Sequence, residues 1–234
     1  MNAKLDSLPR PLRLCSLLGL LLLWTACNGT TLLQANFNSD AVGSPPAPAQ
    51  GTGTVSVDKG AGTVIVVAKP TAGLPDYRWA RINHPTAPSP ETTMTGNFSQ
   101  FGGNGHYNLL ASLFLPSGAG VATVQFEAFG SSAEFLHLDF MPEGNVRVDD
   151  VEASRFGQFP RDQSFVVSVN LDITAAAATA HVALLGAGAS GSTDVTVKPA
   201  LMPVAHQFGA VKFWMGFQHK GSFFVDDILV KRKN

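Results

Sequence analysis

The chain reads Ser164-Phe165-Val166-Val167-Ser168-Val169-Asn170-Leu171-Asp172-Ile173, and this stretch decides the fold class. Apolar side chains stand at alternate positions, and the positions between them are mostly polar: the apolar series is Phe165, Val167, Val169, Leu171 and Ile173. Successive side chains of a β-strand point to opposite faces of a sheet. The alternation therefore predicts a strand with one face in the core and the other in water.

Short runs of the same kind recur about every ten to fifteen residues from Thr31 onward, separated by Gly, Pro, Asn and Asp. We expect strands over 33–38, 54–57, 63–68, 77–83, 92–98, 107–115, 122–129, 135–140, 145–148, 179–185, 193–197, 209–218 and 222–231. The Pro-rich segment 43–51 is expected to be a loop, and 175–180 a hairpin connection despite its alanines. This pattern predicts an all-β protein with an antiparallel β-sandwich.

The N-terminal segment, residues 1–26, has the layout of a secretory signal peptide, because a positive region precedes the apolar run 14–24. The run ends in Trp24-Thr25-Ala26-Cys27, which resembles a bacterial lipobox, although Trp24 stands where an aliphatic residue is usual. We expect a lipoprotein signal peptide over 1–26, lipid attachment at Cys27, a tether over 27–32 and one domain over 33–234. Plain secretion is the alternative.

The cysteine count supports a lipid on Cys27. The second cysteine, Cys15, lies in the segment that would be removed, so Cys27 has no partner for an internal disulfide. The membrane is then a partner through the lipid, and Asn28 after the cysteine favours the outer membrane. Without residues 1–26 the chain keeps 13 basic and 16 acidic residues. We expect no nucleic-acid partner, because such partners need concentrated Lys and Arg.

The chain resembles the concanavalin A-like (laminin-G-like) jelly roll in three stretches: Leu33-Gln34-Ala35-Asn36-Phe37-Asn38, Phe159-Pro160-Arg161-Asp162-Gln163-Ser164-Phe165 and Phe223-Phe224-Val225-Asp226-Asp227-Ile228-Leu229-Val230. That group includes lectins, carbohydrate-binding modules and polysaccharide-cleaving enzymes. The resemblance implies two curved antiparallel sheets with the first and last strands adjacent. It implies no particular reaction, because function belongs to sites rather than folds.

The same resemblance implies a structural Ca²⁺ near the last strand, held by Asp226 and Asp227. Calcium takes six to eight oxygen ligands, so Asn38 or Asp40 and backbone carbonyls would have to contribute. The alternative is that one aspartate caps a turn and the other faces solvent.

A candidate site lies on the expected hairpin of strands 122–129 and 135–140. Its apolar residues fill the core, which leaves Gln125, Glu127, His137 and Asp139 on the opposite face. Pairing of Phe129 with Phe135 would set Glu127 across from His137, and Gln125 across from Asp139. Such a cluster can bind sugar hydroxyls, supply an acid and a base for glycoside cleavage, or form a solvated sheet face.

The expected strand 209–218 carries a second set of candidates, because Lys212, Trp214 and Gln218 stand on its outward face. An indole beside polar groups is a platform for a sugar ring. The alternative places Trp214 inside the sandwich or beneath a loop.

Other motifs carry no chemistry. The G-x-G-x-x-G match over 186–191 precedes a strand instead of a helix, so we interpret it as a turn. The histidines have no zinc-ligand spacing. We therefore expect a lipid-anchored envelope protein with a non-catalytic, carbohydrate-binding jelly roll and no required cofactor. The alternatives are a polysaccharide hydrolase or lyase using Glu127, His137 and Asp139, and a structural or adhesive protein without a small ligand.

Overall fold

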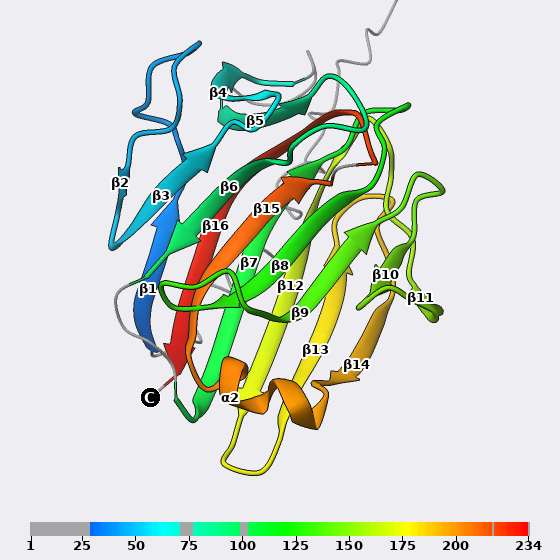
Figure 1. Cartoon of the computed structure of the whole chain (residues 1–234). Coiled ribbons are helices and arrows are strands. Elements are labelled where there is room, and N and C mark those ends of the chain that lie inside the picture. Colours follow the sequence, from blue (N-terminus) through cyan, green and yellow to red (C-terminus); the bar gives the residue numbers. More distant parts are fainter. Residues whose placement is uncertain (1–28, 71–76, 99–102, 217, 234) are drawn as a thin grey trace, which may run out of the picture.

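The computed structural model describes residues 29–70, 77–98, 103–216 and 218–233. The expected signal peptide and Cys27 lie outside the described residues, so lipid attachment stays a prediction. Two antiparallel sheets make up most of the described chain, and one lies in front of the other in Figure 1. This arrangement confirms the predicted antiparallel β-sandwich.

The first sheet lies behind in Figure 1. Its path of paired strands is β14 (Ser192–Thr196), β13 (Ala178–Leu185), β12 (Ser164–Ile173), β7 (Gly105–Phe114), β16 (Gly221–Lys233), β5 (Arg78–His84) and β4 (Thr63–Ala68), and β1 (Gly29–Ala35) also pairs with β16. The pairing of β1 with β16 places the first and last strands side by side, as the resemblance implied.

The second sheet lies in front. Its path is β11 (Val151–Phe156), β10 (Val146–Val148), β9 (Glu134–Phe140), β8 (Ala122–Ala128), β15 (Phe208–Met215), β6 (Thr92–Asn97), β3 (Gly53–Asp58) and β2 (Ala49–Gln50). Two short helices, η1 (Pro199–Leu201) and α2 (Met202–Ala205), connect β14 to β15. We call the face turned away from the first sheet the outer face of the second sheet.

Strand β12 has the bounds that the alternation predicts, and the five apolar side chains of the alternating series are buried. It pairs with β7 along its whole length and with β13 from Val166 to Ile173. Aromatic side chains from both sheets meet between them: Phe208 packs edge-on against Phe98, Tyr107 and Phe135 at ring-centroid distances of 5.1, 5.4 and 5.5 Å. This core holds the strands of the second sheet in a fixed register.

Several boundaries differ from the sequence prediction. The expected loop 43–51 ends in β2, and the expected strand 209–218 ends at Met215. Strand β11 was missed, because its side chains are half-buried or exposed and its sequence does not alternate. The turn over 186–191 is confirmed, since Gly186, Gly188 and Gly191 all have positive φ. Within the described residues, no helix has the length and apolar character needed to cross a membrane.

Candidate functional site on the outer face of the second sheet

Strands β8 and β9 divide their side chains between the core and the outer face, as the sequence predicts. Val124 and Phe126 are buried in the core, and the alternate positions Thr123, Gln125 and Glu127 point to the other face. These three polar side chains are also buried, at 3 to 5 % exposure. The outer face of β8 is therefore not freely solvated, in contrast to the alternative of a solvated sheet face.

The predicted register of this hairpin is wrong by two residues along β9. Gln125 lies opposite His137, Thr123 opposite Asp139 and Glu127 opposite Glu134. The cause is the turn, which closes between Ala128 and Ala133 and by itself displaces the pairing by three residues. The extra residue in β9, at the register shift between Phe126 and Glu127, reverses one of the three. The hairpin is closed by the Ala128 N–H donating to the Ala133 carbonyl, at 2.9 Å, instead of by a Phe129–Phe135 pair.

A pocket of about 480 Å³ opens over β8, β9, β10 and β15. Five predicted site residues line it: Gln125, His137, Asp139, Lys212 and Trp214. The other two do not belong to the lining. The Glu127 carboxylate accepts a hydrogen bond from Gln125 Nε2 at 2.9 Å, and Gln218 lies exposed in the turn after β15. The structure thus joins two candidate groups that the sequence could only treat separately.

Arg147 and Asp150 belong to the site, and sequence reasoning missed both. Arg147 Nη2 lies 2.8 Å from Asp139 Oδ2 and 2.7 Å from Asp150 Oδ1. Asp139 Oδ1 also accepts a hydrogen bond from Thr123 Oγ1 at 2.7 Å. The buried Asp139 carboxylate is therefore held on both sides, which fixes the floor of the pocket.

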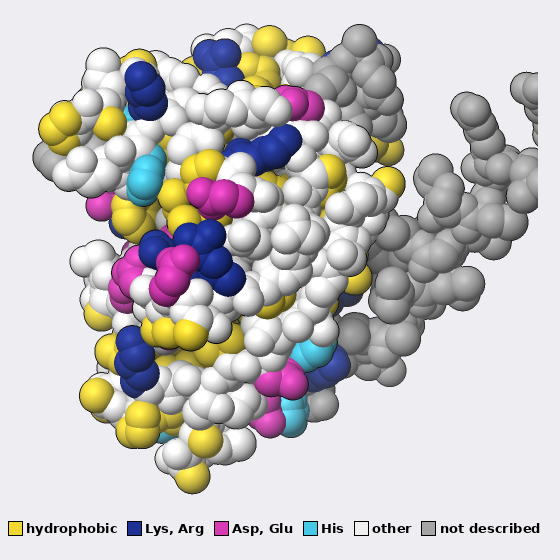
Figure 2. All heavy atoms as spheres, turned by 90° about the vertical axis from the view of Figure 1, so that its right-hand side faces the viewer, with side chains coloured by type: hydrophobic (Ala, Val, Ile, Leu, Met, Phe, Trp, Pro, Cys, Tyr) yellow, Lys and Arg dark blue, Asp and Glu magenta, His cyan; other side chains and the backbone are white. Residues whose placement is uncertain are grey.

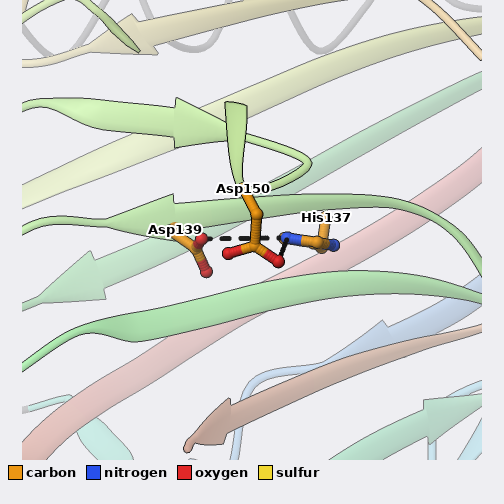
Figure 3. Close-up of side chains that lie close together, drawn as sticks. All are labelled: His137, Asp139 and Asp150. Atoms are coloured by element: carbon orange, nitrogen blue, oxygen red, sulfur yellow. Dashed lines mark ion pairs between the residues drawn. The ribbon is translucent and has the colours of Figure 1, made fainter. Parts of the chain in front are cut away.

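His137 lies among four carboxylates, two of which, Asp139 and Asp150, are drawn with it in Figure 3. Its Nε2 is 3.4 Å from Asp150 Oδ2 and 3.7 Å from Asp139 Oδ2, and its Nδ1 is 3.5 Å from Glu134 Oε1 and 3.8 Å from Asp149 Oδ1. Burial lowers the pKa of His137, but the hydrogen bond to Glu134 and the charges of the surrounding carboxylates outweigh it and raise the pKa above its ordinary value.

The turn between β10 and β11 positions Asp150. Val148 pairs with Val151, and both intervening residues have positive φ, at 50° for Asp149 and 57° for Asp150. This is the geometry of a two-residue type I′ turn, which residues other than Gly, Asn and Asp rarely adopt. The Asp149 carboxylate accepts the backbone N–H of His137 at 3.0 Å, so the turn is tied to β9. The Asp149-Asp150 pair between two valines was the sequence signal for this turn.

Two glutamates of the hairpin have pKa values displaced in opposite directions. Burial raises the pKa of Glu127 above its ordinary value, although Lys212 opposes the effect. The hydrogen bond to His137 lowers the pKa of Glu134. At neutral pH, Glu134 is therefore the more firmly ionised of the two.

Strand β15 brings Lys212 and Trp214 to the pocket. Lys212 Nζ lies 3.5 Å from Glu91 Oε2, 3.9 Å from Glu127 Oε1 and 5.2 Å from the centroid of the Trp214 ring. The indole Nε1 is buried and has no hydrogen-bond partner among the described residues. The indole is half-buried and lines the pocket. It is therefore neither the fully exposed platform that the sequence suggested nor a core residue.

A buried histidine joins the loops at one end of the pocket. His84 is fully buried, its Nδ1 lies 2.6 Å from the His219 carbonyl oxygen, and its Nε2 lies 2.6 Å from Ser89 Oγ. His219 and Glu91, which follows the Ser89 loop, both line the pocket. His84 therefore links the β5–β6 loop to the β15–β16 loop.

A metal ion would have one group of ligands in the described part of the chain: His137, Asp139 and Asp150, whose ligand atoms lie within 4.8 Å of one another. The Arg147 guanidinium already binds both carboxylates, so a cation would have to compete with it. The pocket edge is also rich in ion pairs. Figure 2 shows acidic and basic side chains mixed on the side of the molecule where β10 and β11 lie.

The predicted calcium ligands Asp226 and Asp227 do not belong to this group. Asp226 is buried and Asp227 is exposed, with a φ of 47° at a register shift in β16. Asp40 accepts hydrogen bonds from Ala47 N–H and Gln50 Nε2, and Asn38 accepts one from Arg78 N–H. The described residues add no third acidic or histidine ligand, and the calcium site stays a prediction.

Comparisons with known proteins support the fold. No family model and no curated protein matches the sequence. Among solved structures, a Shewanella oneidensis MR-1 protein of unknown function has a TM-score of 0.57 at 14 % identity, covering 97 % of both chains. A Streptomyces sioyaensis endo-1,3-beta-glucanase has a TM-score of 0.51 at 10 % identity, covering 88 % of this chain and 96 % of its own.

Arcelin-5, a lectin-like defense protein from Phaseolus vulgaris, has a TM-score of 0.50 at 8 % identity and covers 87 % of this chain and 98 % of its own. Identities this low establish architecture and leave activity open. Together with the two antiparallel sheets and the adjacent first and last strands, these similarities show that the described chain has the concanavalin A-like jelly-roll fold.

Proposed function

We propose that this chain is an exported, lipid-anchored envelope protein whose outer-face pocket binds carbohydrate without cleaving it. One observation carries the proposal: the indole of Trp214 lines a pocket of about 480 Å³ together with polar side chains from three neighbouring strands. Sugar rings present both apolar C–H faces and hydroxyl groups. A ring of this kind can stack on an indole while its hydroxyls meet fixed donors and acceptors.

The polar groups of the pocket are held in place before a ligand arrives. Asp139 is fixed by Thr123 and Arg147, and Gln125 donates to Glu127. Ordering such side chains on binding costs roughly 0.5 to 1.5 kcal/mol for each one. Because the network is already ordered, this cost is largely absent, which favours binding of a ligand as polar as a sugar.

The fold adds support of a coarser kind. A glucanase and a lectin-like protein have the same architecture. Their low identity to this chain leaves the ligand to be argued from the pocket itself, so the proposal rests on Trp214 and its polar neighbours.

The envelope location is inferred from the N-terminal sequence. The apolar run 14–24 followed by Thr25-Ala26-Cys27 supports export and lipid attachment. Metabolic labelling with a fatty-acid analogue is expected to label the wild-type chain and not the Cys27→Ser variant. Labelling of the variant at the wild-type level would show that the lipid is attached elsewhere. A wild-type chain without label would contradict lipid attachment.

A glycan array tests the binding proposal. Wild-type protein should bind at least one glycan class, and Trp214→Ala should lose that binding. Tyr77→Ala is a matched control, because Tyr77 is an exposed aromatic residue that does not line the pocket. Binding that survives in Trp214→Ala, or no binding by the wild type, would overturn the proposal. The latter result would favour a structural or adhesive role.

Hydrolysis of a polysaccharide is the second candidate, and one observation favours it: the opposed pKa displacements of Glu127 and Glu134. Pairs of carboxyl groups displaced in this way can serve as acid and base. We favour binding, because Glu127 does not line the pocket and Asp139 is already bound to Arg147. Release of reducing sugar by the wild type, lost in Glu127→Gln, would favour the hydrolase.

A further inference from the structure

The charges of the outer-face pocket point to the kind of glycan it takes. We infer that the pocket selects glycans that carry free amino groups and rejects glycans that carry carboxylate or sulfate groups. This inference rests on the proposed function, since it names the carbohydrate class for the same site. Its basis is the way in which the cations and carboxylates of the pocket are paired.

Both permanent cations of the pocket already have carboxylate partners: Lys212 has two, and Arg147 has three, of which Glu152 at 3.9 Å is the most distant. Lys212 Nζ lies near Glu91 and Glu127, at 3.5 and 3.9 Å. Arg147 Nη2 lies near Asp139 and Asp150, at 2.8 and 2.7 Å. An acidic sugar would have to displace a carboxylate from one of these cations and would then lie beside the displaced group. Like charges in such proximity are unfavourable, so acidic glycans are rejected.

Carboxylates exceed cations in the pocket. Glu91, Glu134, Asp139 and Asp150 line it, against Lys212 and Arg147. With both lining histidines neutral, the formal charge of the lining is therefore −2, and protonation of His137 changes it to −1. Either state leaves an excess of negative charge that a ligand cation can neutralise.

Two of these carboxylates are accessible to a ligand. The side chains of Glu134 and Asp150 are 43 % and 71 % exposed, and they flank His137 at 3.5 and 3.4 Å. An ammonium group on a sugar would approach these carboxylates from the open side of the pocket. At Asp150 it would share the carboxylate with Arg147, whose Nη2 lies 2.7 Å from Oδ1, so Glu134 is the freer of the two. Charge-assisted hydrogen bonds of this kind are about twice as strong as neutral ones, so an amine gains more than a hydroxyl or an N-acetyl group at that position.

Calorimetry with three hexamers of equal length tests the inference on the full-length chain: glucosamine, N-acetylglucosamine and glucuronic acid. We expect the glucosamine hexamer to bind about tenfold more tightly than the N-acetylated one, and the acidic hexamer not to bind measurably. Added salt should reduce the difference, because the selecting carboxylates are exposed.

Two variants locate the selection. Glu134→Gln and Asp150→Asn should each reduce the affinity ratio between the glucosamine and N-acetylglucosamine hexamers toward one. Asp194→Asn is the matched control, because this exposed aspartate also pairs with a histidine, His181 at 2.7 Å, on the first sheet and away from the pocket. Its ratio should equal that of the wild type.

The outcomes separate this inference from the proposed function. If glycans bind in a Trp214-dependent manner but the glucosamine hexamer binds no more tightly than its N-acetylated counterpart, the charge selection is wrong and the binding proposal stands. Tighter binding of the acidic hexamer, or a ratio unchanged in both variants, would also overturn the selection. If no glycan binds, both proposals fail.

Discussion

Replacing Asp226 by Asn should stabilise the protein at neutral pH. Asp226 lies in the central strand β16 at 1 % exposure, with Ser112 of β7 opposite it, and its Oδ1 has no hydrogen-bond partner in the described structure. Burial, followed by the neighbouring charge of Asp227, raises the pKa of Asp226 to about 8. The folded protein therefore holds this carboxyl in its neutral form at pH 7. An Asn amide has the same shape and is neutral without binding a proton, so folding no longer requires proton uptake.

The magnitude follows from linkage. The pKa is about 8 in the folded chain and 3.8 for the reference aspartate. The unfolded chain therefore releases its proton first, and stability falls as pH rises from about 4 to about 8. Each unit of pKa difference corresponds to about 1.36 kcal/mol, which gives a destabilisation of about 4 kcal/mol at pH 7. Asn does not titrate, so the variant should gain up to that amount at pH 7 and almost nothing at pH 4.

Urea denaturation between pH 4 and pH 8 measures this difference as a shift of the unfolding midpoint. Asp58→Asn is a suitable control, because Asp58 is exposed and an Asn side chain can still accept the Gly60 N–H. The reasoning is refuted if Asp226→Asn unfolds more readily than the wild type at pH 7. A stability difference that does not change with pH would refute it equally.

Three further predictions concern the pocket and the core. Asp139→Ala should destabilise the protein by about 1 to 3 kcal/mol in urea denaturation, because it removes the buried partner of Thr123 and Arg147 while Arg147 keeps Asp150; a stability equal to that of the wild type would contradict the network. His84→Leu should cost about 2 kcal/mol by the same assay and weaken glycan binding, since it frees the loop that carries His219; unchanged affinity would remove the positioning role. Phe208→Ala should cost about 3 to 5 kcal/mol in thermal unfolding, through the cavity left among the aromatic rings; unaltered unfolding would show that those rings do not form the core.

The sequence predicted the architecture because periodicity is a local property. The alternation over Ser164–Ile173 gave β12 its correct bounds, and the same reasoning separated core from outer face in β8 and β9. It missed β11, whose half-exposed side chains leave no period to detect. It also extended β15 beyond Met215, because the apolar alternation was continued through Gly216, where the strand ends.

The site was predicted only in part, because it depends on contacts between distant segments. Five of its residues could be named from their strand faces, but the position of the turn between β8 and β9 changed which residues lie opposite one another. Arg147 and Asp150 were missed, since only the pairing of β10 with β9 brings them to Asp139 and His137. The turn fixes the register of a hairpin, and the segment 129–134 does not by itself decide which residues close the turn, so the register could be corrected only from the structure.

The central claim is that Trp214 contacts a sugar, and the indole Nε1–H signals of the protein in a ¹H–¹⁵N spectrum test it most directly. Trp214 lines the pocket and Trp79 lies in β5 of the first sheet, while the third tryptophan, Trp24, lies in the expected signal peptide and is absent from the processed chain used for the spectrum. Assigning the signals with a Trp214→Phe variant and then titrating a glycan that the array identifies should shift the Trp214 signal and leave that of Trp79 in place. Saturating glycan that shifts Trp79 alone, or neither signal, would contradict the account.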